Sequence, residues 1–208
     1  MDPITQQGIA GAAGAGGDPV YLDDIFSTFL YDGTGSTQSI NNGIDLSGEG
    51  GMVWLKRRDD STTHQLYDTE RGTTKSWNSN GSSAETTRPG GVTAFNSNGF
   101  TVGNYTDENG SGADLCSWTF RKAPGFFDIV TYTGNGVAGR TIPHALGSTP
   151  GMIIVKSLNN SYDPQVYHRS AGQGKYFELN QQNAEGSDTT RWNNTAPTSS
   201  EFTVGSYG

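Results

Sequence analysis

The chain has 208 residues, a formal net charge of −8 and only 16% charged side chains. This acidic balance excludes a nucleic-acid partner held by a basic surface, because such binding needs cationic side chains that displace counterions from phosphates. With 30 glycines, the composition favours turns and short strands over long helices. No run approaches the ~20 apolar residues of a membrane span, and the single cysteine, Cys116, cannot form an internal disulfide.

The N-terminal segment, residues 1–18, is rich in glycine and alanine and lacks the bulk to form a core. It has no cationic n-region, so we expect no signal peptide and synthesis in the cytoplasm. Two interpretations of this flexible arm stay open: a tail or linker, and a peptide that becomes ordered in a groove of a partner. In the second interpretation the docking residues are Ile4, Ile9, Ala10, Ala12 and Ala13.

The first expected unit covers residues 19–122. A strand is predicted at Phe26–Tyr31, before a glycine-rich turn. The run Gly51–Lys56 has four consecutive apolar residues between a glycine and a lysine, which is typical of a short strand covered on both faces. A further strand is predicted within Gly99–Tyr105.

The last predicted strand of this unit is Leu115–Phe120. Apolar side chains at Cys116, Trp118 and Phe120 alternate there with hydroxyl side chains, which predicts a strand with one buried face. We therefore expect Trp118, like Trp54 in the earlier strand, to lie in the core.

The second expected unit, residues 123–208, repeats the first. The run Gly51–Lys56 returns one hundred positions later as Gly151–Lys156, and Phe127–Tyr132 repeats the first predicted strand. The offset drifts from 100 to 102 along the chain, as expected when strands correspond and loops vary. The fold predicted is all-β, with two tandem related β-sandwich units of jelly-roll type behind the flexible arm.

The repeat breaks at its end, because no counterpart of the Leu115–Phe120 strand follows by Gly208. We therefore expect the second unit to be incomplete. Its missing strand would come from a continuation of the polypeptide, or another chain would cover the open edge.

Chemical motifs are sparse, and the sequence predicts no cofactor. The three histidines are far apart and not at metal-ligand spacing, so we expect no metal site. Acidic pairs such as Asp107-Glu108 lack calcium-loop spacing, and solvated turns are expected for them.

Asp68 and Glu70 lie beside Arg71 and raise the alternative of a glycan-degrading enzyme, in which paired carboxylates act as acid and base. The second unit has His168 and Ser170 at these two positions, so both units cannot share that catalysis. A solvated loop or a local salt bridge is the preferred interpretation, and the chain is expected not to be an enzyme.

Two tryptophans, Trp77 and Trp192, have polar neighbours on both sides. Each is either an aromatic residue that covers the core from a sheet face or an exposed platform on which a sugar ring stacks.

The chain resembles virion structural proteins of marine tailed bacteriophages, cyanophages in particular. The resemblance rests on Met1–Gln7, Tyr21–Thr28 and Asn41–Lys56. The second unit, from Tyr132 to Gly205, is similar to a module repeated along tail-fibre-like proteins.

This resemblance implies a β-rich, non-enzymatic component of the virion, assembled in the host cytoplasm: a tail fibre or a neck or baseplate appendage, commonly trimeric. Its partners would be other virion proteins and, through a distal region, a host cell-surface glycan. A capsid-surface decoration protein and a glycan-binding module for host adsorption are the alternatives. The resemblance supplies no catalytic residues.

Overall fold

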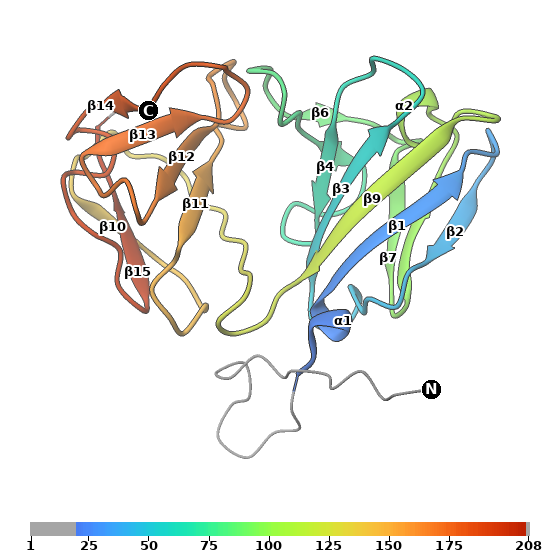
Figure 1. Cartoon of the computed structure of the whole chain (residues 1–208), viewed down its shortest axis with the longest axis horizontal. Coiled ribbons are helices and arrows are strands. Elements are labelled where there is room, and N and C mark those ends of the chain that lie inside the picture. The colour runs from blue at the N-terminus through green and yellow to red at the C-terminus, as the bar shows by residue number, and fades with distance from the viewer. Residues whose placement is uncertain (1–19, 207–208) are drawn as a thin grey trace.

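The computed structural model describes residues 20–206 and is mostly β, with several antiparallel sheets (Figure 1). The only helices in that range are the single turns α1 (Leu22–Ile25) and α2 (Thr106–Asn109). The predicted all-β class is confirmed at this level. The proposed docking residues of the arm, Ile4, Ile9, Ala10, Ala12 and Ala13, lie outside the described residues.

The strands fall into two groups that Figure 1 shows as two lobes joined by the segment after β9. No strand pairing crosses from one lobe to the other among the described residues. The strands of the first lobe are β1 (Phe26–Asp32), β2 (Gln38–Asn41), β3 (Gly51–Arg57), β4 (Gln65–Asp68), β5 (Lys75–Ser76), β6 (Thr86–Thr87), β7 (Val92–Asn96), β8 (Gly99–Val102) and β9 (Asp114–Arg121).

The second lobe contains shorter strands. They are β10 (Arg140–Pro143), β11 (Met152–Val155), β12 (Gln165–His168), β13 (Lys175–Glu178), β14 (Gly186–Ser187) and β15 (Glu201–Val204).

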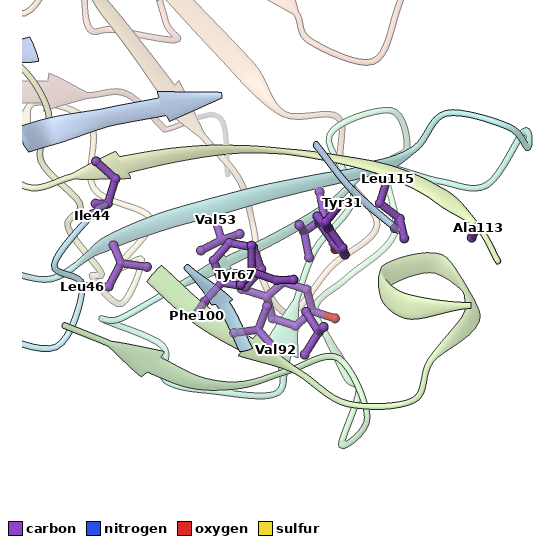
Figure 2. Packing of buried hydrophobic residues seen from close by; sticks show 12 residues of the cluster. Tyr31, Ile44, Leu46, Val53, Tyr67, Val92, Phe100, Ala113 and Leu115 are labelled. Carbon is purple, nitrogen blue, oxygen red and sulfur yellow. The ribbon is translucent and has the colours of Figure 1, made fainter. Parts of the chain in front are cut away.

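The first lobe is built from a four-stranded sheet, β1-β9-β3-β4, and a three-stranded sheet, β2-β8-β7. Buried apolar side chains from both sheets form one core cluster (Figure 2). Its centre contains Val53 and Tyr67 from the larger sheet and Phe100 from the smaller one, all fully buried. β9 is central to this lobe, because it pairs with β1 along one edge and with β3 along the other.

The face of β9 that meets the core differs from the sequence prediction. Leu115, Ser117 and Thr119 are fully buried, whereas Trp118 and Phe120 are half-buried on the outer side of the sheet. The expectation that Trp54 and Trp118 lie in the core is wrong: they form a cross-strand pair on this outer side, with ring centroids 6.1 Å apart. The hydroxyl of Thr119 is tolerated inside because it accepts a hydrogen bond from Asn42 Nδ2 at 2.8 Å.

The sequence repeat is present in the strand pairing. In the first lobe β3 pairs with β4 from Met52↔Asp68 to Leu55↔Gln65, and in the second β11 pairs with β12 from Met152↔His168 to Val155↔Gln165. Every partner is displaced by one hundred positions. The β10–β15 pair likewise repeats the β2–β8 pair in register, with an offset of 102.

The second lobe lacks a counterpart of β9 within the described residues, and its main sheet is β11-β12-β13-β14. The prediction of a strand at 127–132 is wrong: Phe127 forms only an isolated bridge with Ala123, and the segment is otherwise irregular. The physical reason is the partner, because β1 obtains its strand pairing from β9. A segment at the corresponding position of the repeat that has no such neighbour has no ladder to join.

Candidate functional site

The two carboxylates that raised the possibility of acid–base catalysis are held in separate ion pairs. Asp68, at the end of β4, is 5% exposed and lies 2.6 Å from Arg71 Nε. The same guanidinium reaches Glu85 at 2.9 Å. Asp68 is therefore the buried partner of a cation that fixes the turn after β4.

Glu70 points to a different cation, since its Oε1 accepts a hydrogen bond from Lys122 Nζ at 2.7 Å. Lys122 also lies 3.4 Å from Asp128, so it links the end of the first lobe to the segment that opens the second. Burial acts against its charge, but the hydrogen bond to Glu70 and the charge of Asp128 together raise the pKa of Lys122.

An open depression of about 540 Å³ lies near this loop and is lined by Glu70 but not by Asp68. Acid–base cleavage of a glycoside needs two carboxyl groups that flank the same bond. Glu70 and Glu49 line the depression, whereas Asp68 is buried against Arg71, so the Asp68–Glu70 pair does not flank a common bond there.

Trp77 and Trp192, considered as stacking platforms, are both buried, with 9% and 4% of their surface exposed. Trp192 packs edge-to-face on Tyr167 at a centroid separation of 5.9 Å, and its Nε1–H donates to the carbonyl of Lys175 at 3.0 Å. Neither ring presents an open face to a sugar, which agrees with the alternative interpretation of aromatic residues that cover the core.

A buried polar cluster that the sequence did not indicate is centred on Glu108, in α2. Its side chain is fully buried and accepts hydrogen bonds from Tyr67 Oη at 2.5 Å and from Arg88 Nε at 2.7 Å. Its backbone carbonyl accepts a further bond from Tyr31 Oη at 2.7 Å. Arg88 also reaches Asp107 at 2.9 Å. The expectation of a solvated turn for Asp107-Glu108 is therefore wrong for Glu108.

The electrostatics of this cluster favour one protonation state. Burial, followed by the nearby charge of Glu108, raises the pKa of Tyr67, so that its hydroxyl remains a donor. Burial disfavours the cation of Arg88, but its hydrogen bond with Glu108 and the charge of that residue raise the pKa of the guanidinium. The cluster fixes α2, and α2 leads directly into β9.

The neighbouring residue, Asn109, fixes the same connection to the turn after β1. Its side chain accepts from the backbone N–H of Thr34 at 2.9 Å and from Gln38 Nε2 at 2.7 Å. Residues 106–109 therefore act as a structural anchor that holds β9 between its neighbours.

The polar residues that the two lobes share support turns and strand ends. Lys56 Nζ donates to the carbonyls of Arg57 and Asp60, and Lys156 Nζ donates to the equivalent carbonyls of Ser157 and Asn160. The lysine that closes each apolar run thus holds the loop that follows it.

A second shared contact pairs the short strands. Lys75 Nζ donates to Thr87 Oγ1 at 2.9 Å, and Lys175 Nζ donates to Ser187 Oγ at 2.9 Å. The same lysines lie 3.9 Å from Glu85 and 3.0 Å from Glu185. The repeat therefore preserves the lysine contacts that support turns and strand ends, whereas the candidate catalytic carboxylates are not repeated.

The histidines are not gathered into a site. His64 accepts a hydrogen bond from Trp54 Nε1 at 2.8 Å, and burial together with the charge of Lys56 lowers its pKa. Within residues 20–206 no group of three or more His, Cys, Asp or Glu side chains is placed to hold a metal ion. The helices described there are too short to cross a membrane. Cys116 is buried, as expected of a small apolar residue.

These features define a mostly β protein with an internal structural repeat, in which the buried polar groups support the fold. The chain belongs to the family described as Domain of unknown function (DUF7483), which matches residues 22–208. No curated protein and no solved structure matches it.

Proposed function

We propose that the chain is a structural, non-enzymatic component of a tailed-phage virion, a tail fibre or a neck or baseplate appendage attached through its N-terminal arm. The proposal builds on the resemblance to virion proteins of marine phages. We also infer that each lobe is a β-sandwich of jelly-roll type and that the assembled protein is a homotrimer.

The observation that carries the proposal is which features of the first lobe are repeated in the second and which are not. The second lobe repeats the strand register and the turn lysines of the first. It also repeats the edge-to-face contact of Tyr31 with Phe100, as Tyr132 with Phe202. The acidic pair Asp68 and Glu70 has no counterpart in the second lobe. Asp68 forms an ion pair with Arg71, and Glu70 forms one with Lys122. Repetition of architecture without repetition of a polar site favours a protein that spans distance or joins partners over one that performs catalysis.

Attachment through the arm is tested in phage particles. Deletion of residues 2–17 should abolish incorporation of the protein into the particle. A matched variant with Ile4→Asp and Ile9→Asp in the full-length arm separates the loss of apolar anchors from the loss of length. Undiminished incorporation of both variants would show that attachment lies elsewhere.

Position on the particle is tested by electron microscopy of virions that carry a labelled copy of the chain. Label at the tail, neck or baseplate supports the proposal, whereas label over the capsid surface supports a decoration protein. A polysaccharide-hydrolysis assay of the wild type and Glu70→Gln separates a structural protein from an enzyme. Hydrolysis by the wild type that Glu70→Gln abolishes would contradict a structural role.

A further inference from the structure

Five asparagines in the chain are followed directly by glycine, at positions 42, 80, 98, 109 and 135. Asparagine is a thermolabile residue, and in such a pair the backbone nitrogen of the glycine can attack the side-chain carbon Cγ. Glycine has no Cβ to hinder that approach. Because the five pairs share this local sequence, the fold decides which of them react.

The reaction converts asparagine to aspartate in two balanced steps. The glycine nitrogen gives up its proton and forms a bond to Cγ, which closes a succinimide ring. The bond from Cγ to Nδ2 then breaks, and Nδ2 leaves as ammonia with that proton. Water opens the ring at either carbonyl and yields aspartate or isoaspartate. Both nitrogens therefore have to be available, and negative charge develops on Oδ1 during the attack.

The pair Asn109–Gly110 is closed to this reaction. Asn109 is fully buried, and its Nδ2 donates to the carbonyls of Ser36 and Gly103, each at 2.5 Å. The backbone N–H of Gly110 donates to the carbonyl of Thr106 at 3.1 Å. The native fold therefore holds both reacting nitrogens in hydrogen bonds.

The pairs at positions 42 and 98 restrain each other. Asn42 Nδ2 donates to Thr119 Oγ1 at 2.8 Å, so the leaving nitrogen is held. The backbone N–H of Gly43 donates to Asn98 Oδ1 at 2.9 Å, which engages the attacking nitrogen of one pair and the side chain of the other. Gly99 is buried in β8, where a Cβ would lie 2.0 Å from a backbone carbonyl oxygen. This close packing leaves little space for ring closure at position 98.

Asn80 differs from these three asparagines. It is exposed, in the loop that leads from β5 into β6 (Figure 1). Its Oδ1 accepts a hydrogen bond from the backbone N–H of His64 at 3.0 Å. Within residues 20–206 neither Asn80 Nδ2 nor the backbone nitrogen of Gly81 has a hydrogen-bond partner. The two nitrogens that have to react are therefore available.

The hydrogen bond of the Asn80 side chain favours the first step. It involves Oδ1, which is neither the attacking nor the leaving atom. The N–H of His64 thus faces the oxygen on which negative charge develops, and a donor in that position stabilises an oxyanion. Asn80 combines exposure with support for the developing charge.

Asn135–Gly136 is the other exposed pair. Asn135 Oδ1 accepts from the backbone N–H of Val137 at 3.1 Å, within its own turn. In the described part of the chain neither reacting nitrogen of this pair has a hydrogen-bond partner. Because its support is local, this pair is the internal reference for reaction at an exposed turn.

We propose that Asn80 is a modification site, at which the folded chain converts asparagine to aspartate and isoaspartate without an enzyme, while the fold protects Asn42, Asn98 and Asn109. The product adds one negative charge to a chain whose formal net charge is −8. It also places a carboxylate next to His64, whose ring accepts the indole N–H of the buried-sheet neighbour at 2.8 Å. The inference does not depend on the proposed role in a virion.

The test is incubation of the full 208-residue chain at mildly alkaline pH, followed by peptide mapping. Each converted site raises the mass by about 1 Da, and an isoaspartate methyltransferase labels the isoaspartate product. Conversion at Asn80 should be about tenfold or more faster than at Asn42, Asn98 or Asn109, because those sites first have to lose native hydrogen bonds or packing. Conversion at any of those three sites as fast as at Asn80, or an unconverted Asn80, would overturn the proposal.

Two controls separate the effect of the fold from that of the local sequence. In denaturant the native hydrogen bonds are lost, so the five pairs should convert at similar rates. A faster reaction of Asn80 that persists in denaturant would overturn the assignment to the fold. The variant Asn80→Gln keeps an acceptor for the N–H of His64 but would have to close a larger ring, so conversion at position 80 should stop while that at Asn135 continues. Conversion that continues at position 80 in this variant would refute Asn80 as the reacting residue.

Discussion

Replacing Glu108 by glutamine tests whether the buried cluster holds β9 in place. The substitution keeps the shape of the side chain but removes the charge that Arg88 contacts through two nitrogens, at 2.7 and 3.0 Å. The carbonyl oxygen of glutamine can still accept from both Tyr67 Oη and Arg88 Nε, as Glu108 Oε1 does. Its NH₂ group, however, is a donor and cannot replace the second carboxylate oxygen.

The expected loss follows from these contacts. A hydrogen bond to a charged group contributes about 1.5–3 kcal/mol, and breaking a buried ion pair costs about 3–5 kcal/mol when one charge is left without a partner. In this variant Arg88 still has a charged partner, because Asp107 lies 2.9 Å from it, and the Arg88 side chain is 22% exposed to water. We therefore expect Glu108→Gln to lower the free energy of unfolding of the first lobe by about 2–3 kcal/mol.

Denaturant unfolding combined with amide hydrogen exchange measures this loss, because the two lobes need not unfold together. Exchange should accelerate at Val53 and Leu55, in the core strand that pairs with β9. It should not change at Val166 and Tyr167, in the second lobe. A uniform acceleration in both lobes would show that the cluster does not act on the first lobe alone.

Asp107→Asn is the matched control, since Asp107 binds the same guanidinium but is 25% exposed. Its loss should stay below about 1 kcal/mol, as for a partly exposed ion pair. If Glu108→Gln costs no more than Asp107→Asn, the argument from burial is refuted.

Two further predictions concern backbone contact and pH. A Cβ at Gly205 would lie 1.4 Å from the carbonyl oxygen of Thr190, so Gly205→Ala should lower the free energy of unfolding of the second lobe by at least about 2 kcal/mol. Gly134 has nothing within 4 Å of the position that a Cβ would occupy, so Gly134→Ala should change that free energy by no more than about 0.5 kcal/mol. Denaturant unfolding of both variants measures the difference. His64 has a lowered pKa in the folded state, so the unfolded state binds more protons below about pH 6.5 and stability should fall as the pH drops through that range. An NMR titration of His64 measures its pKa directly. The variant His64→Gln keeps an acceptor for the Trp54 N–H and should reduce the pH dependence of the free energy of unfolding. An unchanged pH dependence would show that His64 is not its source.

The repeat was the part of the fold that the sequence predicted best. Apolar runs behind a glycine define where short strands form, and the offset between the two copies defines which strands correspond. Phe26–Tyr31, Gly51–Lys56 and Leu115–Phe120 lie in strands of the structure, and the pairing register of β11 with β12 confirms the offset of one hundred.

The face that a strand buries was not predictable from its pattern alone. Alternation in β9 predicted burial of Cys116, Trp118 and Phe120. Cys116 is buried, but the rings of Trp118 and Phe120 are half-buried on the outer face, and the smaller Ser117 and Thr119 are fully buried instead. The space between the two sheets is already filled by large side chains such as Tyr67 and Phe100. Small side chains opposite them complete the packing, and this requirement is set by distant residues.

Glu108 was missed for a related reason. Its partners Arg88 and Tyr67 are 20 and 41 positions away, so no local spacing signals the cluster. A carboxylate in a turn next to another acidic residue resembles a solvated loop. Only the tertiary structure brings a guanidinium and a phenol to it and makes burial favourable.

A comparison of the two apolar runs distinguishes the requirements for strand formation from the requirements for complete burial of the side chains. Gly51–Lys56 and Gly151–Lys156 have the same register with their following strand, and their lysines hold equivalent loop carbonyls. Formation of the strand and the turn is therefore encoded within each copy. Complete burial occurs only in the copy that has a third strand beside it, because Val53 is fully buried and Ile153 is not. The core of this repeat is consequently a property of two adjacent strands together, because Val53 and Leu55 in β3 are fully buried beside β9.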